Sequence, residues 1–387
     1  MIRYSLFVIP SILCCCKQVE EGKAIKNLPP LTLVLNGKDS IPTDSISRVI
    51  GSDIFYIQEH NNDYLVINNS YAFTQIDIYE YGKKRFFKRI KLEKEGPNGL
   101  GAPPSGLFVK SLDTMFLFFN LGQRLVSIDG EGRIIRNYGS IHNPFNSSNG
   151  HLYPYLEVSA LQPLFYANGK LFFCTYEVEN KQEYGGAIFD LNESKLKFPF
   201  KLPPQYRNGW WAGIVYDRYY HFYDSETGRY IRSYGNDHNL YISGSKEDIV
   251  VFAKSIYLSN ELMPYSKLPG DFAREEINLY KYSALQGGYS TIKYDRWREV
   301  YYRYVIMPVS SDRYQNPSSI WSNMGILILD KNFSYRGEFK IPARYSWYQS
   351  FVSPKGLCFL DKEAFSKSED AMVFANFSIQ AGSLDDL

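Results

Sequence analysis

EGPNGLGAPPSGLFVKSLDTMFLFFNLGQRLVSIDGEGRIIRNYG, residues 95–139, is the stretch that decides the fold of this chain. A turn-rich entry precedes four short apolar runs: LFV, MFLFF, LVSI and RIIRNY. Runs of this length, separated by Gly, Asn and Asp, are typical of β-strands. DGEG at 129–132 predicts a tight hairpin between the last two runs. Four antiparallel strands in about 45 residues match one blade of a β-propeller.

Related hairpins recur along the chain. Each has a strand, a turn of Asp, Gly or Asn and a second strand, and we interpret each as an outer blade hairpin: 76–92, 187–200, 221–235 and 325–341. YDRYYHFYD (216–224) also echoes YDRWREVYYRY (294–304), which suggests equivalent positions in two blades.

Composition and length agree with an all-β chain. The 387 residues include 33 Tyr, 26 Phe and 5 Trp, and aromatic residues suit pleated, half-buried strands. No long helical periodicity follows residue 30. Units of about 50 residues predict a single propeller of six to eight four-stranded blades, with seven or six favoured. MVFANFSI (372–379) is expected to close the ring against LTLVLNG (31–37), because closure removes exposed sheet edges.

A cysteine triplet ends the apolar start of the chain, MIRYSLFVIPSILCCCK. The basic Arg3 and the short apolar run are typical of a secretory signal and too short for a stable membrane span. Leu13 to Cys16 resembles the bacterial lipobox, with Cys16 as the lipidated residue. The alternative is a metal or disulfide cluster, which the triplet fits poorly because it lacks ligand spacing and has only two later cysteines to partner it.

These signals divide the chain into a lipoprotein signal peptide (1–16), a linker (17–30) and a propeller domain (31–387). Glu20 and Glu21 resemble the surface-export signal of Bacteroidetes lipoproteins. We therefore expect export and a lipid anchor in the outer membrane, on its periplasmic or cell-surface face, so that the membrane is one partner.

Residues 95–139 also resemble the blades of NHL-type and TolB-like propellers. GPNG, PSGL, GQRL and DGEG occupy the places of the family's motifs, although Gly122 replaces the Asn of its N-x-R element. Over most of its length the chain resembles a Bacteroidetes lipoprotein family, domain of unknown function 4221. The lipobox, EGPNGLG, YDRWREVYYRYV and GILILDKNFSYRGEF carry this resemblance. It implies a secreted, lipid-anchored, propeller-like domain and no established reaction.

Charge and motifs exclude several functions. The net charge is +2, from 43 basic and 41 acidic residues, without the basic excess typical of nucleic-acid binders. We therefore predict no nucleic-acid partner. The five histidines lack a compact ligand spacing, and no P-loop or G-x-S-x-G elbow occurs. No metal, no cofactor and no catalytic residue is predicted. Cys174 and Cys358, in similar strand contexts, are expected to be buried free thiols.

Two segments are candidate binding sites. In YYRY, strand alternation puts Tyr301 and Arg303 on one face, and in the central channel Arg303 could hold a carboxylate or phosphate. The alternative, which we favour, is an inter-blade ion pair with a buried arginine stem. In NGWWAG, Trp210 and Trp211 could stack on sugar rings or anchor a protein partner. An inter-blade plug explains these tryptophans equally well.

The favoured function is a binding or scaffolding module with a glycan or protein partner. The alternative is a carbohydrate-active enzyme, a glycoside hydrolase or lyase, since propellers also host those chemistries. A hydrolase requires two carboxylates that converge across the channel. Asp217 and Asp295 are candidates for such a pair. Fold by itself does not choose between these functions.

Overall fold

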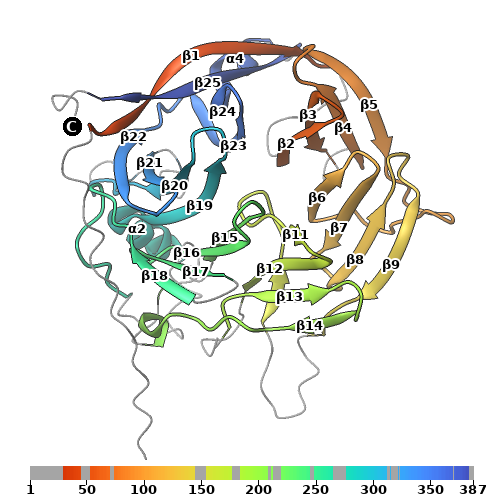
Figure 1. The fold of residues 1–387 in the computed structure, drawn as a ribbon, viewed down its shortest axis with the longest axis horizontal. Coiled ribbons are helices and arrows are strands. Elements are labelled where there is room, and N and C mark those ends of the chain that lie inside the picture. Colours follow the sequence, from red (N-terminus) through yellow and green to blue (C-terminus); the bar gives the residue numbers. More distant parts are fainter. Residues whose placement is uncertain are drawn as a thin grey trace, which may run out of the picture.

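The computed structural model describes residues 29–44, 53–69, 74–143, 154–176, 184–207, 211, 219–244, 248–264, 276–311, 314, 321, 323–368 and 370–382. Their strands form six antiparallel sheets arranged around one axis (Figure 1). The fold is a six-bladed β-propeller. This confirms the prediction of a single propeller with six to eight blades.

Blades 1 to 3 follow each other along the chain. Blade 1 contains β2 (Asp53–Glu59), β3 (Asn62–Asn68), β4 (Gln75–Glu80) and β5 (Arg85–Lys91). Blade 2 contains β6 (Gly106–Ser111), β7 (Thr114–Phe119), β8 (Arg124–Ile128) and β9 (Ile134–Ser140). Blade 3 contains β10 (Tyr155–Glu157), β11 (Phe165–Ala167), β12 (Lys170–Tyr176), β13 (Ala187–Asp190) and β14 (Lys195–Lys197).

Blades 4 to 6 complete the ring. Blade 4 contains β15 (Tyr219–Asp224), β16 (Arg229–Tyr234), β17 (Asn239–Ser243) and β18 (Asp248–Phe252). Blade 5 contains β19 (Gly288–Asp295), β20 (Val300–Ile306), β21 (Met324–Asp330) and β22 (Tyr335–Lys340). Blade 6 contains β23 (Tyr345–Ser353), β24 (Gly356–Asp361), β25 (Ala371–Ala381) and, as its outermost strand, β1 (Leu31–Pro42).

The quoted stretch is blade 2, and its four predicted strands are the four strands observed. Three of the four predicted outer hairpins are outer hairpins. The exception is 221–235, because β15 and β16 are the two innermost strands of blade 4. The echo between 216–224 and 294–304 is also misleading. Tyr219–Asp224 is an innermost strand, whereas the YYRY segment lies on the second strand of blade 5.

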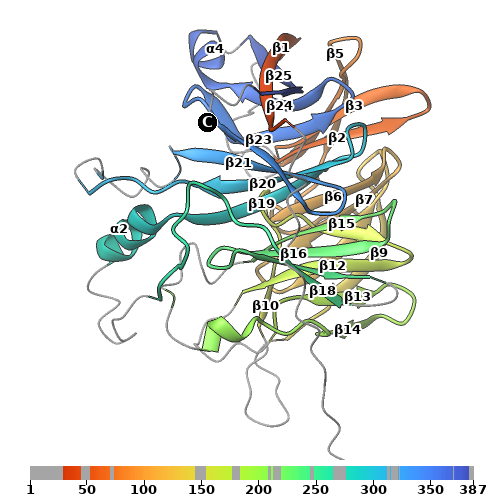
Figure 2. The ribbon, with the colours of Figure 1, turned by 60° about the vertical axis from the view of Figure 1, so that its left-hand side comes forward.

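Short helices interrupt the strands. A 3-10 turn, η1 (Pro204–Arg207), lies between blades 3 and 4, and α4 (Lys362–Lys367) lies in blade 6. Helix α2 (Glu276–Gln286) precedes β19 at one face of the ring (Figure 2). The sequence did not predict α2 because its buried stripe is narrow, with Leu279 and Ala284 as its buried apolar residues among the side chains described.

The buried side chains gather at the boundaries between blades. One cluster joins blades 1 and 2 through residues such as Ile76 and Leu117. Another joins blades 2 and 3 through Phe118 and Phe173, whose rings meet at 5.0 Å. Cys174 and Cys358 lie on the second strands of blades 3 and 6, and both are buried thiols that form no disulfide bond, as predicted.

The ring closes where β1 pairs with β25. Leu31 lies opposite Ala381 and Leu35 opposite Phe377, with a register shift between Leu35 and Lys38. This is the closure expected between 31–37 and 372–379. One strand from the N-terminal end of the domain therefore completes the sheet that the C-terminal strands begin (Figure 1).

Asp39 on β1 stabilises the closure of the ring through contacts with both blades that meet there. Its buried carboxylate accepts hydrogen bonds from Lys355 Nζ (2.7 Å) and Asn376 Nδ2 (2.8 Å) in blade 6. It also accepts one from Tyr81 OH (2.8 Å) and pairs with Lys84 Nζ (2.9 Å), both in blade 1. Burial alone raises the pKa of Asp39, but these four partners outweigh it and hold the pKa well below its usual value.

We expect Asp39→Asn to lower the free energy of unfolding by about 2 kcal/mol at pH 7, the range for hydrogen bonds to a charged group. Because the folded-state pKa is lowered, the carboxylate stabilises the fold above pH 4 and this stability is lost as the pH falls. Urea titrations at pH 7 and pH 3 measure both effects. The exposed Asp248→Asn serves as the control, and an equal loss in both variants at pH 7 would contradict the role of Asp39.

Candidate functional site

The innermost strands of the blades surround the central axis of the ring (Figure 1). A cavity of about 260 Å³ lies between them, lined from β2, β6, β15, β19, β23 and the segment around β11, and we call it the central channel. Most of the wall is apolar, with residues such as Phe55, Phe108, Phe165, Ile292 and Phe351. Each inner strand thus contributes to one shared wall, which no single blade could form.

Three polar side chains define what we call the channel site: Asp53, Lys293 and Tyr348. They come from β2, β19 and β23 and line the same cavity. Asp53 accepts a hydrogen bond from Asn68 Nδ2 (3.2 Å). Within the described part of the chain, Lys293 Nζ has no hydrogen-bond partner and no carboxylate oxygen within 4.0 Å, and Tyr348 OH has no partner either. The polar groups are therefore available to a ligand.

In all three side chains of the channel site, burial shifts the pKa toward the uncharged form. Burial raises the pKa of Asp53 to about 6, against the opposing effects of the Asn68 hydrogen bond and the Lys293 charge. Burial lowers the pKa of Lys293 to about 8, while the Asp53 charge acts in the opposite direction. Burial and the Asp53 charge raise the pKa of Tyr348 to about 12. Titratable groups perturbed by desolvation inside a cavity are typical of functional sites.

The channel widens into a second hollow of about 440 Å³, which we call the channel mouth. Tyr56, Tyr294 and other residues line both spaces, so the two are continuous. The mouth lies where the inner strands end and contains Trp297, which is 37% exposed. The Arg296 guanidinium stacks on the Trp297 ring at 4.6 Å and donates to Gln58.

Arg303, the first predicted binding residue, does not reach the channel. It lies fully buried on β20, and its guanidinium donates to Ser233 Oγ (3.0 Å) and to the backbone oxygens of Asp237 (2.6 Å), His238 (2.8 Å) and Ala253 (2.9 Å). All these acceptors belong to blade 4 or the segment that leaves it. Arg303 therefore joins blades 4 and 5, with backbone carbonyls rather than a carboxylate as its partners.

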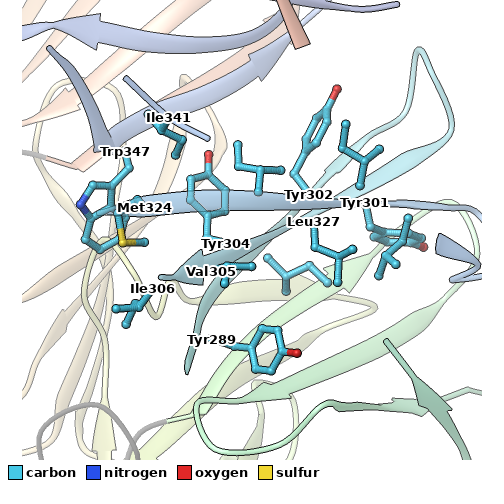
Figure 3. Close-up of a cluster of buried hydrophobic side chains, with 14 of the residues drawn as sticks. Tyr289, Tyr301, Tyr302, Tyr304, Val305, Ile306, Met324, Leu327, Ile341 and Trp347 are labelled. Carbon is cyan, nitrogen blue, oxygen red and sulfur yellow. The ribbon is translucent and has the colours of Figure 1, made fainter. Parts of the chain in front are cut away.

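Tyr301 has a similar structural setting. Its hydroxyl donates to Asp224 Oδ2 (3.0 Å) and its ring stacks on Phe333. Strand alternation on β20 is as predicted, because Tyr302 and Tyr304 point to the other side of the strand (Figure 3). The two faces of β20 are turned toward the two neighbouring blades, and not toward the channel and the exterior. The Tyr304 hydroxyl, for example, forms a hydrogen bond with Ser350 in blade 6.

Of the other predicted residues, the structure describes Trp211 and Asp295, and neither lines the channel cavity. Trp211 is buried, and its indole Nε1 donates to Gln205 O (3.1 Å). Trp210, Asp217 and Cys16 lie outside the described residues. Asp295 ends β19, but its buried carboxylate accepts hydrogen bonds from Tyr302 OH (3.0 Å) and the Arg298 guanidinium (3.0 Å).

Asp53, Lys293 and Tyr348 were not identified from the sequence. Each lies in a strand that mixes polar with aromatic or β-branched residues, DIFYIQE, GYSTIKYD or YSWYQSFVS, and a polar residue in such a strand usually marks a solvent-facing position. The sequence of each strand therefore does not distinguish these residues from their polar neighbours. Their convergence depends on ring geometry that no local pattern contains.

Fold and site together define a class: a six-bladed propeller with a cavity of about 260 Å³ between its inner strands. A family model, Domain of unknown function (DUF4221), matches residues 32–340, and the chain belongs to this family. The resemblance to this family, seen in EGPNGLG and the later motifs, is thereby confirmed, whereas the lipobox lies outside the matched residues.

Solved structures show the same fold. A DUF4221 family member from Bacteroides vulgatus superposes with a TM-score of 0.77 at 24% identity, covering 92% of this chain and 99% of its own. A Bacteroides fragilis protein, whose name assigns it to the exported proteins, has a TM-score of 0.51 at 10% identity and covers 92% and 98%. No functionally curated protein matches the chain. Across the described ranges, no helix is both long and apolar enough to cross a membrane.

Replacement of Arg303 tests its structural role. We expect Arg303→Gln to lower the free energy of unfolding by about 4 kcal/mol, because several buried carbonyl oxygens lose their donors. The exposed Arg133→Gln should cost less than about 1 kcal/mol. Denaturant titration distinguishes the two. A stable Arg303→Gln protein would return this residue to the binding candidates.

Replacement of Asp53 should change the stability of the protein in the opposite direction to replacement of Asp39. We expect Asp53→Asn to raise the free energy of unfolding at pH 7.5, since it removes a desolvated charge and can still accept from Asn68. The raised folded-state pKa means that the wild type gains stability as the pH falls from about 6 toward 4, so the advantage of the variant should vanish there. Thermal unfolding across pH 4 to 8 provides the measurement, and a destabilised variant at pH 7.5 would indicate a structural carboxylate.

Proposed function

We propose that this protein is an exported, lipid-anchored binding protein that holds a small molecule in the central channel of its propeller. The observation that carries this proposal is the channel site. Asp53, Lys293 and Tyr348 line one cavity, and among the residues that the structure describes, only Asp53 has a hydrogen-bond partner for its polar side-chain atoms, through one hydrogen bond from Asn68. Since uncompensated charges inside a fold lower its stability, a site that retains them favours a ligand that supplies the missing partners.

The shape of the channel supports a small ligand. Pockets for drug-sized ligands typically occupy roughly 300–1,000 Å³, and the inner cavity, at about 260 Å³, lies just below that range. Its wall is apolar, with few polar groups at one place, which is the usual composition of a ligand pocket. The channel mouth supplies an entry path with an exposed indole and charged groups of both signs.

The address of the protein is inferred from its first residues. The basic start, the short apolar run and the lipobox-like Leu13 to Cys16 support lipidation of Cys16 and export. The name of the Bacteroides fragilis neighbour agrees with export for that protein. An outer-membrane location, periplasmic or at the cell surface, follows from the resemblance to Bacteroidetes lipoproteins. A glycan or protein partner at the channel mouth belongs to the same proposal.

The alternative of a carbohydrate-active enzyme has less support. Asp295 was one of its two candidate carboxylates, and this group is occupied by Tyr302 and Arg298 in its own hairpin. A carboxylate that holds a turn in this way is poorly placed to exchange protons with a substrate. Binding without catalysis is therefore the function we favour.

Ligand-observed NMR on a library of small metabolites tests binding in the channel. We expect hits whose signals disappear with Val352→Trp, because Val352 lines both the cavity and the mouth and an indole would fill the passage. The control is Val250→Trp on the exposed face of β18, which should retain binding. Circular dichroism verifies the fold of both variants. Hits that persist with Val352→Trp, or the absence of hits, would refute a channel ligand.

Metabolic palmitate labelling tests the anchor. Cys16→Ala should abolish labelling and leave an unprocessed precursor, whereas Cys14→Ala should still be labelled. Unchanged labelling of Cys16→Ala would show that the predicted cleavage position is wrong.

A further inference from the structure

We propose that the ligand of the channel is a free α-amino acid with an apolar side chain. Asp53 receives its ammonium group, Lys293 receives its carboxylate, and the apolar channel wall receives its side chain. This inference rests on the proposed function and specifies the substrate class of the same site.

The arrangement of the two charges is the first reason. Asp53 and Lys293 are the charged residues among the described residues that line the cavity, and they carry opposite signs. They are close enough for each to influence the pKa of the other, yet no ion pair within 4.0 Å joins them. A group with a cation and an anion on neighbouring atoms can lie between them and compensate both.

Charge complementarity also disfavours simpler ligands. A carboxylic acid bound to Lys293 would place its charge near Asp53, and an amine bound to Asp53 would place its charge near Lys293. In a cavity of low effective dielectric constant each of these like-charge contacts is costly. A zwitterion with the right orientation avoids both, because each of its charges faces a charge of opposite sign.

Hydrogen-bonding capacity fits the same ligand. The Lys293 ammonium and the Tyr348 hydroxyl supply donors for a carboxylate, whose two oxygens accept several hydrogen bonds. Asp53 uses one oxygen for Asn68, and among the described residues its other oxygen has no hydrogen-bond donor, so it can accept from an ammonium group. Hydrogen bonds between charged groups are the strong ones in proteins.

The remaining wall sets the preference for the side chain. Phe55, Phe108, Phe165, Ile292 and Phe351 present apolar surface to the cavity. A charged side chain would be desolvated there without a partner, which is costly. The volume of about 260 Å³ suits a single residue better than a longer peptide.

Isothermal titration calorimetry with three related compounds tests this inference on the full mature chain. L-phenylalanine has both charges, 3-phenylpropionate only the carboxylate and phenethylamine only the ammonium. We expect L-phenylalanine to bind at least about tenfold more tightly than either analogue, because each charged contact is strong. L-leucine should bind as well, and L-lysine and L-glutamate should bind more weakly.

Two variants assign the charges. Asp53→Asn should weaken L-phenylalanine by about tenfold and strengthen 3-phenylpropionate, since the repelling carboxylate is gone. Lys293→Met should weaken L-phenylalanine and strengthen phenethylamine. Loss of all binding in both variants would show unfolding instead, and thermal unfolding of each variant distinguishes this case.

The outcomes separate the two proposals. The amino-acid inference is wrong if single-charge analogues bind as tightly as L-phenylalanine. It is also wrong if only unrelated metabolites bind and Val352→Trp blocks their binding. In both cases the proposal that the channel binds a small molecule still holds. If nothing binds in the channel, both are wrong. Preference for the dipeptide Phe-Phe over L-phenylalanine would also overturn the inference, in favour of a peptide end.

Discussion

The pairing of β1 with β25 is the constraint on which the rest of the molecule depends. Residues from opposite ends of the domain share one sheet, and 337 positions separate Asp39 from Asn376, whose side chains form a hydrogen bond. Without this pairing the ring would have two open edges. Asp39 reinforces the closure because it joins both blades that meet there, and its burial is compensated by two lysines, an amide and a hydroxyl.

The channel site is a consequence of closure. Asp53 belongs to the first blade and Lys293 to the fifth, and only a closed ring makes them line one cavity. The contrast with Asp39 is informative. Both are desolvated carboxylates, yet the four partners of Asp39 lower its pKa, whereas Asp53 has a single hydrogen-bond donor among the described residues and its pKa rises. One carboxylate joins the two blades at the closure, and the other is the group that we propose to contact a ligand.

Local signals predicted local structure well. The strands and the DGEG hairpin of blade 2 follow from apolar runs and turn residues, and the closing pair follows from the need to cover sheet edges. The same signals failed where position in the blade mattered. YYRY on β20 and YYHFYD on β15 look alike, but one is a second strand buried between blades and the other lines the channel. Strand alternation in YYRY allows Arg303 to face either the channel or a neighbouring blade, and the favoured interpretation, burial between blades, is the position observed.

By itself, the sequence determined an all-β propeller of the DUF4221 family, because strand periodicity and turn chemistry are properties of neighbouring residues. The tertiary structure alone decided the number of blades, the place of each strand within its blade and the meeting of Asp53, Lys293 and Tyr348. The physical reason is that these features depend on contacts between residues far apart in the chain. Ring closure sets those contacts, and the sequence around a polar residue in a strand does not indicate which residues of other blades it will contact.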